Sequence, residues 1–240
     1  MSMAWKNSVI KSFGRGAAAY NKNTNVQKSV ALTLAQDLKT DGVTDILELG
    51  CGSGHLTAAL IDKFPRANIY ATDASADMVG MAQKTTSCDN VAWGVMDAES
   101  PDTNKTYDLI VSNMAVQWFE TPEPSIRGLL KLLNPNGALY FTLPSAESFP
   151  EWLSVLTELG LSSGVLEFPA LSGIYKQEYV TEPYTNAYDF LASMKAIGAG
   201  RPRKGYQPMD FAQMRKACHL FDQRHNGFVT WHIQYGCLNV

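Results

Sequence analysis

The segment from Asp45 to Thr57, DILELGCGSGHLT, constrains the fold of this chain more than any other. An apolar, strand-like run containing Glu48 leads into three glycines at alternate positions, and a helix-compatible stretch follows at once. Gly50, Gly52 and Gly54 allow a tight turn and let the backbone approach a ligand closely. The segment therefore predicts a strand, a glycine-rich loop and a helix start, with a ligand site at the loop.

Length and composition are those of an ordinary globular domain. The chain has 240 residues, of which 45% are hydrophobic and 18% charged. No apolar run approaches the roughly 18–20 residues that cross a bilayer, and the N-terminus lacks the apolar core of a signal peptide. The four cysteines show no paired spacing, so we expect neither zinc nor disulfides and a cytoplasmic location. They are Cys51, Cys88, Cys218 and Cys237.

Charge is distributed unevenly along the chain. The net charge of -3 argues against a general nucleic-acid binder. Residues 1–40 hold six Lys/Arg against Asp37, and residues 195–225 hold seven against Asp210 and Asp222, so each segment carries +5. The two basic segments could meet an acidic partner, or they could be solvated faces without one.

Strand and helix signals alternate from residue 45 to residue 143. Such alternation predicts a mostly parallel sheet covered by helices on both faces, with ligands at the carboxyl ends of the strands. We expect strands at 45–49, 68–72, 91–95, 107–112, 137–143 and 227–235. We expect helices at 6–38, 54–63, 76–84, 123–132 and 209–220. Residues 145–197 read as helix, loop and helix, a cap inserted before the last strands.

The glycine block and the strand ends resemble class I S-adenosylmethionine-dependent methyltransferases. Glu-Leu-Gly-Cys-Gly-Ser-Gly at 48–54 resembles their first motif, and Asp73, Asp97-Ala98 and Ser112-Asn113 follow the next three strands in order. The loop spacing differs from the G-x-G-x-x-G of dinucleotide-binding proteins, and no Tyr-x-x-x-Lys follows, which disfavours an NAD enzyme. The resemblance implies a seven-stranded, mostly parallel α/β sandwich with S-adenosylmethionine as cofactor.

The resemblance also implies a set of cofactor contacts. Asp73 would bind the ribose hydroxyls, Met78 would pack on the adenine and Asp97 would accept from its amino group. Asp73 could instead be a helix N-cap, Met78 a core residue and Asp97 an exposed turn residue. Glu48 would hydrogen-bond the glycine loop or the amino group of the cofactor. The full implied set is Tyr20, Gln27, Glu48, Gly50, Cys51, Gly52, Gly54, Asp73, Ala74, Met78, Asp97, Ala98, Ser112 and Asn113.

The flanks resemble one family more narrowly, the malonyl-[acyl-carrier protein] O-methyltransferases of biotin synthesis. The matching blocks are Phe13–Tyr20 with Gln27, the S-N-M-A-V-Q-W of 112–118, the L-A-S-M-K-A-I-G-A of 191–199 and the last strand, 228–236. The chain departs from the family at Gly200-Arg201-Pro202-Arg203, at Trp231 in place of Tyr, and at 141–152. These departures leave the substrate less secure than the cofactor.

The narrower resemblance implies methyl transfer to the free carboxylate of a malonyl thioester on acyl carrier protein. Arg201 or Arg203 would orient that carboxylate, although either could instead dock the carrier. Tyr20 would close over the sulfonium, unless it simply packs in an amphipathic helix, and Gln27 would reach the carboxylate end of the cofactor. We expect a monomer with no metal, nucleic-acid or membrane partner. Its parts would be an N-terminal lid (1–40), a cofactor core (45–143), a substrate cap (145–200) and a closing helix and strand (205–240), within a single domain (1–240).

Other functions remain open at this point. The acceptor could be a free acid, as in a trans-aconitate-type methyltransferase, which would need no carrier-docking surface. The chain could bind S-adenosylmethionine without catalysis, as an assembly protein. The basic N-terminus could be an organellar transit peptide, although its removal would discard Tyr20. A nucleic acid or protein acceptor has no supporting motif.

Overall fold

The computed structural model describes residue 10 and residues 24–86, 88–196 and 205–240. Within them a seven-stranded sheet has the order β3-β2-β1-β4-β5-β7-β6. The first five strands in this order, β3, β2, β1, β4 and β5, pair in parallel. Strand β7 runs antiparallel between β5 and β6. The strands are β1 (Asp45–Leu49), β2 (Asn68–Asp73), β3 (Val91–Val95), β4 (Tyr107–Asn113), β5 (Leu133–Pro144), β6 (Ile174–Pro183) and β7 (Phe228–Asn239).

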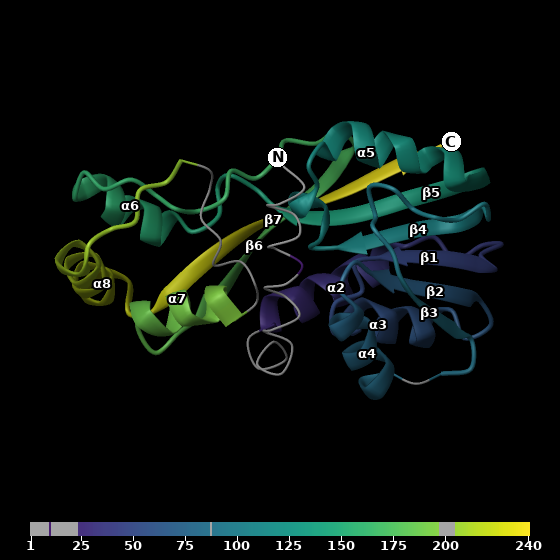
Figure 1. The fold of residues 1–240 in the computed structure, drawn as a ribbon, viewed down its shortest axis with the longest axis horizontal. Helices are drawn as coiled ribbons and strands as arrows, with labels where there is room; N and C mark the ends of the chain where they lie inside the picture. The colour runs from purple at the N-terminus through teal and green to yellow at the C-terminus, as the bar shows by residue number, and fades with distance from the viewer. Residues whose placement is uncertain (1–9, 11–23, 87, 197–204) are drawn as a thin grey trace.

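Helices cover both faces of the parallel half, as the strand–helix alternation predicts. In Figure 1, α2, α3 and α4 lie on one side of the sheet and α5 on the other. Two short 3-10 turns, η1 (Val116–Trp118) and η2 (Leu130–Leu132), flank α5. The helices are α2 (Asn25–Asp37), α3 (His55–Lys63), α4 (Ala76–Thr85), α5 (Pro122–Leu129), α6 (Pro150–Glu158), α7 (Ala187–Ala196) and α8 (Phe211–His225).

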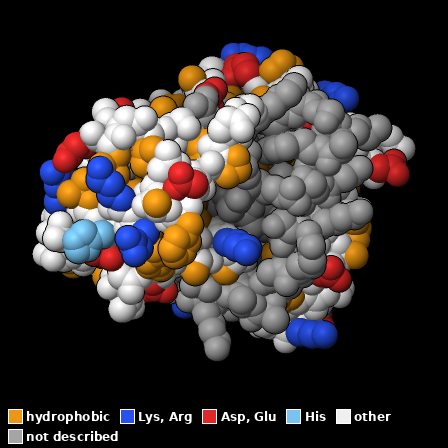
Figure 2. All heavy atoms as spheres, turned by 60° about the vertical axis from the view of Figure 1, so that its left-hand side comes forward, with side chains coloured by type: hydrophobic (Ala, Val, Ile, Leu, Met, Phe, Trp, Pro, Cys, Tyr) orange, Lys and Arg blue, Asp and Glu red, His pale blue; other side chains and the backbone are white. Residues whose placement is uncertain are grey.

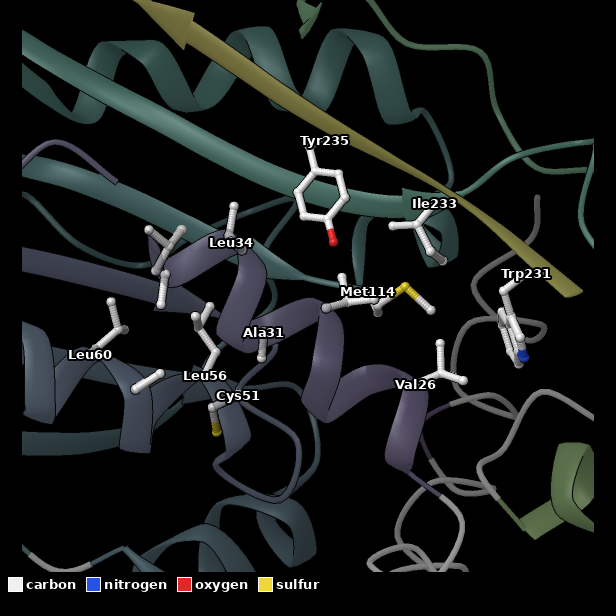
Figure 3. Packing of buried hydrophobic residues seen from close by; sticks show 14 of the residues in the cluster. Val26, Ala31, Leu34, Cys51, Leu56, Leu60, Met114, Trp231, Ile233 and Tyr235 are labelled. Atoms are coloured by element: carbon white, nitrogen blue, oxygen red, sulfur yellow. The ribbon is translucent and has the colours of Figure 1, made fainter. Parts of the chain in front are cut away.

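Helix α2 is a core element of the fold. Its buried residues recur at the three- and four-residue spacing of one helix face, and Val30, Ala31 and Leu34 are fully buried. Figure 3 shows this face packed toward Tyr235 and Ile233 of β7, with side chains of α3 on its other flank. Of the helix expected at 6–38, the structure describes α2 and the helical residue Ile10.

Strand β6 is where the structure differs from the sequence-based prediction. Residues 174–183 were expected within a helix–loop–helix stretch, but they pair with β7 and complete the sheet. Their side chains alternate between half-buried and exposed positions, and several half-buried ones are charged. Lys176, Glu178 and Glu182 on that face hide the strand signal, and inward charges of this kind are typical of an edge strand.

The remaining helices form the cap beyond the carboxyl ends of the parallel strands. Figure 1 shows α6, α7 and α8 gathered around the far ends of β6 and β7. Aromatic side chains hold them together: Phe190 of α7 lies 6.2 Å from Trp152 of α6 and 6.4 Å from Phe221 of α8, measured between ring centroids. None of the helices in the described ranges combines the length and hydropathy that a membrane crossing requires.

Candidate functional site

A pocket lies where the carboxyl ends of β1, β2 and β4 meet, and we call it the glycine-loop pocket. It encloses ≈ 770 Å³, including its open mouth. Eight of the predicted cofactor residues line it: Gly50, Gly52, Asp73, Ala74, Met78, Asp97, Ala98 and Asn113. Chain topology therefore brings together residues that are up to 63 positions apart, from Gly50 to Asn113.

Gly50 can only be a glycine in this loop. Its φ of +74° is a left-handed conformation that side chains disfavour. A Cβ built on it would also lie 2.5 Å from the Cβ of Ala115, another residue of the pocket wall. The adjoining Cys51 N–H donates to the Thr72 carbonyl at 2.8 Å, which anchors the loop on the end of β2. Left-handed backbone conformation at Gly50 and this main-chain hydrogen bond thus fix the path of the loop.

Asp73 ends β2 with its carboxylate held in place by main-chain amides. Its two oxygens accept from Gly52 N at 3.0 Å and from Ser75 N at 2.8 Å. The N-cap of α4 is Ser75, so Asp73 is not merely the start of that helix. Burial raises the pKa of Asp73, while the two amide hydrogen bonds oppose the shift. A carboxylate has about four acceptor sites, so Asp73 can still accept from hydroxyls in the pocket.

Asp97 and Met78 line other parts of the same pocket. Asp97 lies in the turn after β3, where its side chain is exposed and accepts from Glu99 N at 3.0 Å. Met78 is 1% exposed, so it is a core residue and a wall residue at once. Among the described wall residues, Asp73 and Asp97 are acidic and no side chain is basic. This balance suits a ligand that carries positive charge beside an apolar ring.

The end of β4 is a strained turn that fixes the far wall of the pocket. Met114 has a φ of +53°, which is uncommon for a residue with a side chain. Its N–H donates to the Thr142 hydroxyl at 2.9 Å, and its carbonyl accepts from Gln117 Nε2 at 2.7 Å. Hydrogen bonds to the N–H and to the carbonyl of Met114 therefore hold the turn. Within the S-N-M-A-V-Q-W block, Met114 and Gln117 thus have a structural role. Backbone strain of this kind persists where the surroundings over-determine it.

The structure does not bring every predicted cofactor residue to this pocket. Glu48 is buried beneath the loop and accepts from the Thr57 hydroxyl at 2.7 Å; burial raises its pKa to about 7. Ser112 donates to the Leu49 carbonyl at 2.9 Å and is buried between strands. Cys51 is buried as well, and burial raises its pKa. Gly54 is the left-handed N-cap of α3. These four residues shape the loop from behind.

Four further predicted residues remain. Tyr20, Arg201 and Arg203 fall outside the described residues, so their proposed roles stay predictions. Gln27, in the first turn of α2, lines a second pocket rather than the glycine-loop pocket. Its main-chain carbonyl nevertheless accepts from Asn113 Nδ2 at 3.0 Å, so it is close to the end of β4.

The wall also contains residues that the sequence analysis did not assign to the cofactor site. Met114, Ala115, Trp118 and Phe119 follow β4 and line the pocket, as do Ser75, Met96 and Ile10. The signal for the first four was their position directly after the fourth strand. For Ile10 there was no local signal, because its place in the pocket wall depends on tertiary packing.

Comparison with known proteins agrees with this geometry. A family model described as a methyltransferase domain matches residues 47–139. A malonyl-[acyl-carrier protein] O-methyltransferase of Magnetococcus marinus is 31% identical over 95% of this chain and 90% of the relative. The biotin biosynthesis bifunctional protein BioCD of Bordetella avium is 32% identical over 95% of this chain, which spans 51% of that longer protein. The N-methyltransferase NodS of Bradyrhizobium japonicum, solved with S-adenosyl-L-homocysteine, shares the fold with a TM-score of 0.54, 16% identity, and coverage of 97% of this chain and 98% of that one.

The strand order, the glycine loop and the acidic strand ends define a class I methyltransferase whose cofactor is S-adenosylmethionine. The chain belongs to the same methyltransferase family as the Magnetococcus marinus relative. The pocket fits that cofactor: Gly50 leaves room for a close approach, Asp73 presents acceptors for a ribose, and the wall carries no described cation that would repel a sulfonium.

Proposed function

We propose that the chain transfers a methyl group from S-adenosylmethionine to the free carboxylate of a malonyl thioester carried by acyl carrier protein. The observation that carries this proposal is how much of the chain the sequence similarity covers. Identity to a relative named for this activity extends over 95% of the chain, and therefore through the cap as well as the cofactor core. The cap faces the acceptor side of class I methyltransferase folds, so similarity there bears on the substrate.

The residues at the glycine-loop pocket support a positioning mechanism. Asp73 would hold the ribose of the cofactor, Asp97 its adenine, and Asn113 with the loop its methionine end. The cofactor supplies an electrophilic methyl group on a sulfonium. An acceptor carboxylate, with an ordinary pKa of about 4, is already ionised near pH 7 and needs no general base. What the chain must do is align the two groups and exclude water, which can supply roughly 7–11 kcal/mol.

The acceptor side needs a cation and a way to admit an acidic carrier. Arg201 or Arg203 would orient the malonyl carboxylate through the fork of the guanidinium. On the cap, Arg215, Lys216 and His219 lie together along α8. Figure 2 shows basic side chains interspersed with hydrophobic ones on the face that carries the cap. This basic α8 face would attract an acidic carrier.

Esterification would also change what the product can do. A free carboxylate resists transfer into an apolar pocket, because burying its charge is costly. The methyl ester removes that charge and lets the acyl chain be extended like an ordinary fatty acid. This is the chemistry that an early step of biotin synthesis requires, and one relative carries biotin biosynthesis in its name.

The test is a parallel assay with methyl-labelled S-adenosylmethionine. The acceptors are malonyl-acyl carrier protein, malonyl-coenzyme A, free malonate and trans-aconitate. We expect fast transfer to the malonyl-carrier. Transfer to a free acid only, or to none of the four, would overturn the substrate assignment and leave the cofactor site standing.

A further inference from the structure

A second hollow, which we call the α2–β7 pocket, lies between the first turn of α2, the far ends of β6 and β7, and α7. It encloses ≈ 640 Å³, including its mouth. It lies next to the glycine-loop pocket, because Gln27 lines one and its carbonyl accepts from Asn113, which lines the other. Figure 3 shows Val26 and Trp231 of the second pocket in the same packed cluster as Met114 of the first.

Two buried polar atoms in this pocket have no hydrogen-bond partner within the described chain. They are Oε1 of Gln27, whose side chain is 7% exposed, and Nε1 of Trp231, which is 3% exposed. Leaving a buried donor or acceptor unsatisfied is unfavourable, because the group has lost its hydrogen bonds to water and gained none in return. Both atoms are also shut off from solvent, so bulk water does not satisfy them. One is an acceptor and the other a donor, and both belong to residues that line one cavity.

The neighbouring groups do not remove this deficit. The Tyr184 hydroxyl lies near the side chains of Trp231 and Ser193, and burial raises its pKa. Its contact with the indole falls outside strict hydrogen-bond geometry, so it satisfies the Trp231 N–H only weakly. The terminal amide of a glutamine turns about a soft torsion, so a small rotation of Gln27 would present Oε1 to the cavity. The pocket thus offers one acceptor and one donor to a ligand.

The rim of the pocket selects against anions. Glu182 and Asp189 line it, and neither forms an ion pair with a described Lys or Arg. Their carboxylates are held by Asn25 Nδ2 at 2.6 Å and by Thr185 N at 2.9 Å respectively. A phosphate or a free carboxylate would be repelled at this rim. A neutral ligand with one N–H and one carbonyl can meet both unsatisfied atoms without charge repulsion at this rim.

We propose that the α2–β7 pocket binds a secondary amide in the arm of the thioester substrate. Gln27 Oε1 accepts from the amide N–H, and Trp231 Nε1 donates to the amide carbonyl. The acyl end of the arm then reaches past Asn113 toward the glycine-loop pocket, while the acidic rim keeps the charged end of the substrate out of the amide site. This inference rests on the proposed function, because it takes an amide-bearing thioester as the acceptor.

The experiment compares two small acceptors that differ only in the amide. One is the malonyl thioester of N-acetylcysteamine, which carries one secondary amide; the other is the malonyl thioester of pentanethiol, in which methylenes replace it. We expect the wild-type chain to show a KM roughly 5–100-fold lower for the amide-bearing thioester, as two neutral hydrogen bonds would give. Gln27→Leu and Trp231→Phe should each reduce this preference, mainly through KM, and should leave the kcat ratio of the two acceptors unchanged.

Gln36→Leu is the matched control, because Gln36 lies on the same helix with its side chain exposed. It should keep the full preference. An unchanged preference in both pocket variants would overturn the inference, as would an equal loss for both thioesters.

A separate measurement keeps the inference apart from the proposed function. Free pantetheine carries amides but no malonyl group, and its binding can be followed by isothermal titration without methyl transfer. We expect Gln27→Leu to weaken this binding several-fold and Gln36→Leu to leave it unchanged. If the malonyl-carrier is not methylated, the proposed function fails, and the titration still decides whether the pocket binds amides. Equal pantetheine binding by wild type and Gln27→Leu would overturn the inference alone.

Discussion

The Asn113 side chain joins the start of α2 to the end of β4, because its Nδ2 donates to the Gln27 carbonyl at 3.0 Å. Its Oδ1 accepts from the Thr142 hydroxyl at 2.9 Å. The side-chain amide of Asn113 thus donates to α2 and accepts from β5. Asn113, which lines the glycine-loop pocket, is thus bonded to Gln27, which lines the α2–β7 pocket.

Asn113→Asp should disturb that relationship without changing the shape of the residue. The new carboxylate keeps the acceptor for Thr142 but faces the Gln27 carbonyl with an oxygen instead of a donor. We expect the free energy of unfolding to fall by about 1–3 kcal/mol and KM for the acceptor to rise. Urea denaturation and steady-state kinetics measure the two effects. An Asp variant with wild-type stability and KM would show that the bond to Gln27 is dispensable.

Gly50→Ala should damage the glycine loop in two ways. The substitution forces a side chain into a left-handed conformation and places its Cβ against Ala115. We expect a stability loss of about 1–3 kcal/mol and at least a tenfold weaker affinity for S-adenosylmethionine, measured by calorimetric titration. The control is Gly80→Ala on α4, where a Cβ meets nothing within 4 Å. That variant should be as stable as the wild type or slightly more so. Equal affinity in the two variants would contradict the role of Gly50.

Asp73→Asn should weaken cofactor binding more than it weakens the fold. The amide that replaces the carboxylate can accept through one oxygen only, so either Gly52 N or Ser75 N loses its partner. Loss of charged hydrogen bonds worth about 1.5–3 kcal/mol predicts a roughly 10–100-fold rise in Kd for S-adenosylmethionine. The same change at Asp77, exposed on the first turn of α4, should leave Kd within twofold of wild type. If both variants bind the cofactor like the wild type, Asp73 does not contact the ribose.

Glu48→Gln separates the two roles that the sequence left open for Glu48. The ordinary pKa is 4.5, and burial raises the folded-state value to about 7. Between these values the folded chain binds more protons than the unfolded chain, so its stability falls as pH rises from about 4.5 to about 7. Gln does not ionise, so the variant should gain up to about 3 kcal/mol over the wild type at pH 8 and little at pH 5.

Urea denaturation at the two pH values measures this difference, and titration with S-adenosylmethionine supplies the second readout. If Glu48 only supports the loop through Thr57, the affinity of Glu48→Gln for the cofactor should stay within a few-fold of wild type. A large loss of affinity would instead assign Glu48 to the amino group of the cofactor. A stability difference that does not change with pH would contradict the raised pKa.

Charge reversal on α8 tests the carrier-docking role of the basic α8 face. Arg215→Glu with Lys216→Glu should raise KM for a malonyl-carrier several-fold, with an effect that shrinks as salt is added, and should leave KM for a malonyl N-acetylcysteamine thioester unchanged. Lys84→Glu on α4, an exposed residue on a different part of the surface, is the control. Equal effects of both changes on the carrier would show a general charge effect rather than docking.

The sequence by itself determined the cofactor half of this protein. The strands at 45–49 and 91–95 have the predicted limits, and Gly50, Gly52, Asp73 and Asp97 line the predicted pocket. Local signals suffice here, because each βα unit carries its own apolar run, turn glycine and helix cap within a short stretch. Parallel pairing then places the carboxyl ends of those strands at one edge of the sheet.

The tertiary structure decided the rest. Strand β6 exists because β7, about fifty positions later in the chain, offers it a pairing partner, and its charged inner face gave no local sign of this. Glu48 and Ser112 stand beside the glycine loop and the end of β4 in sequence, yet neighbouring elements turn them inward to Thr57 and Leu49. Gln27 faces a pocket that only the packing of α2 against β7 creates. The direction in which a side chain faces depends on elements that are distant in sequence. A local sequence pattern therefore does not predict it.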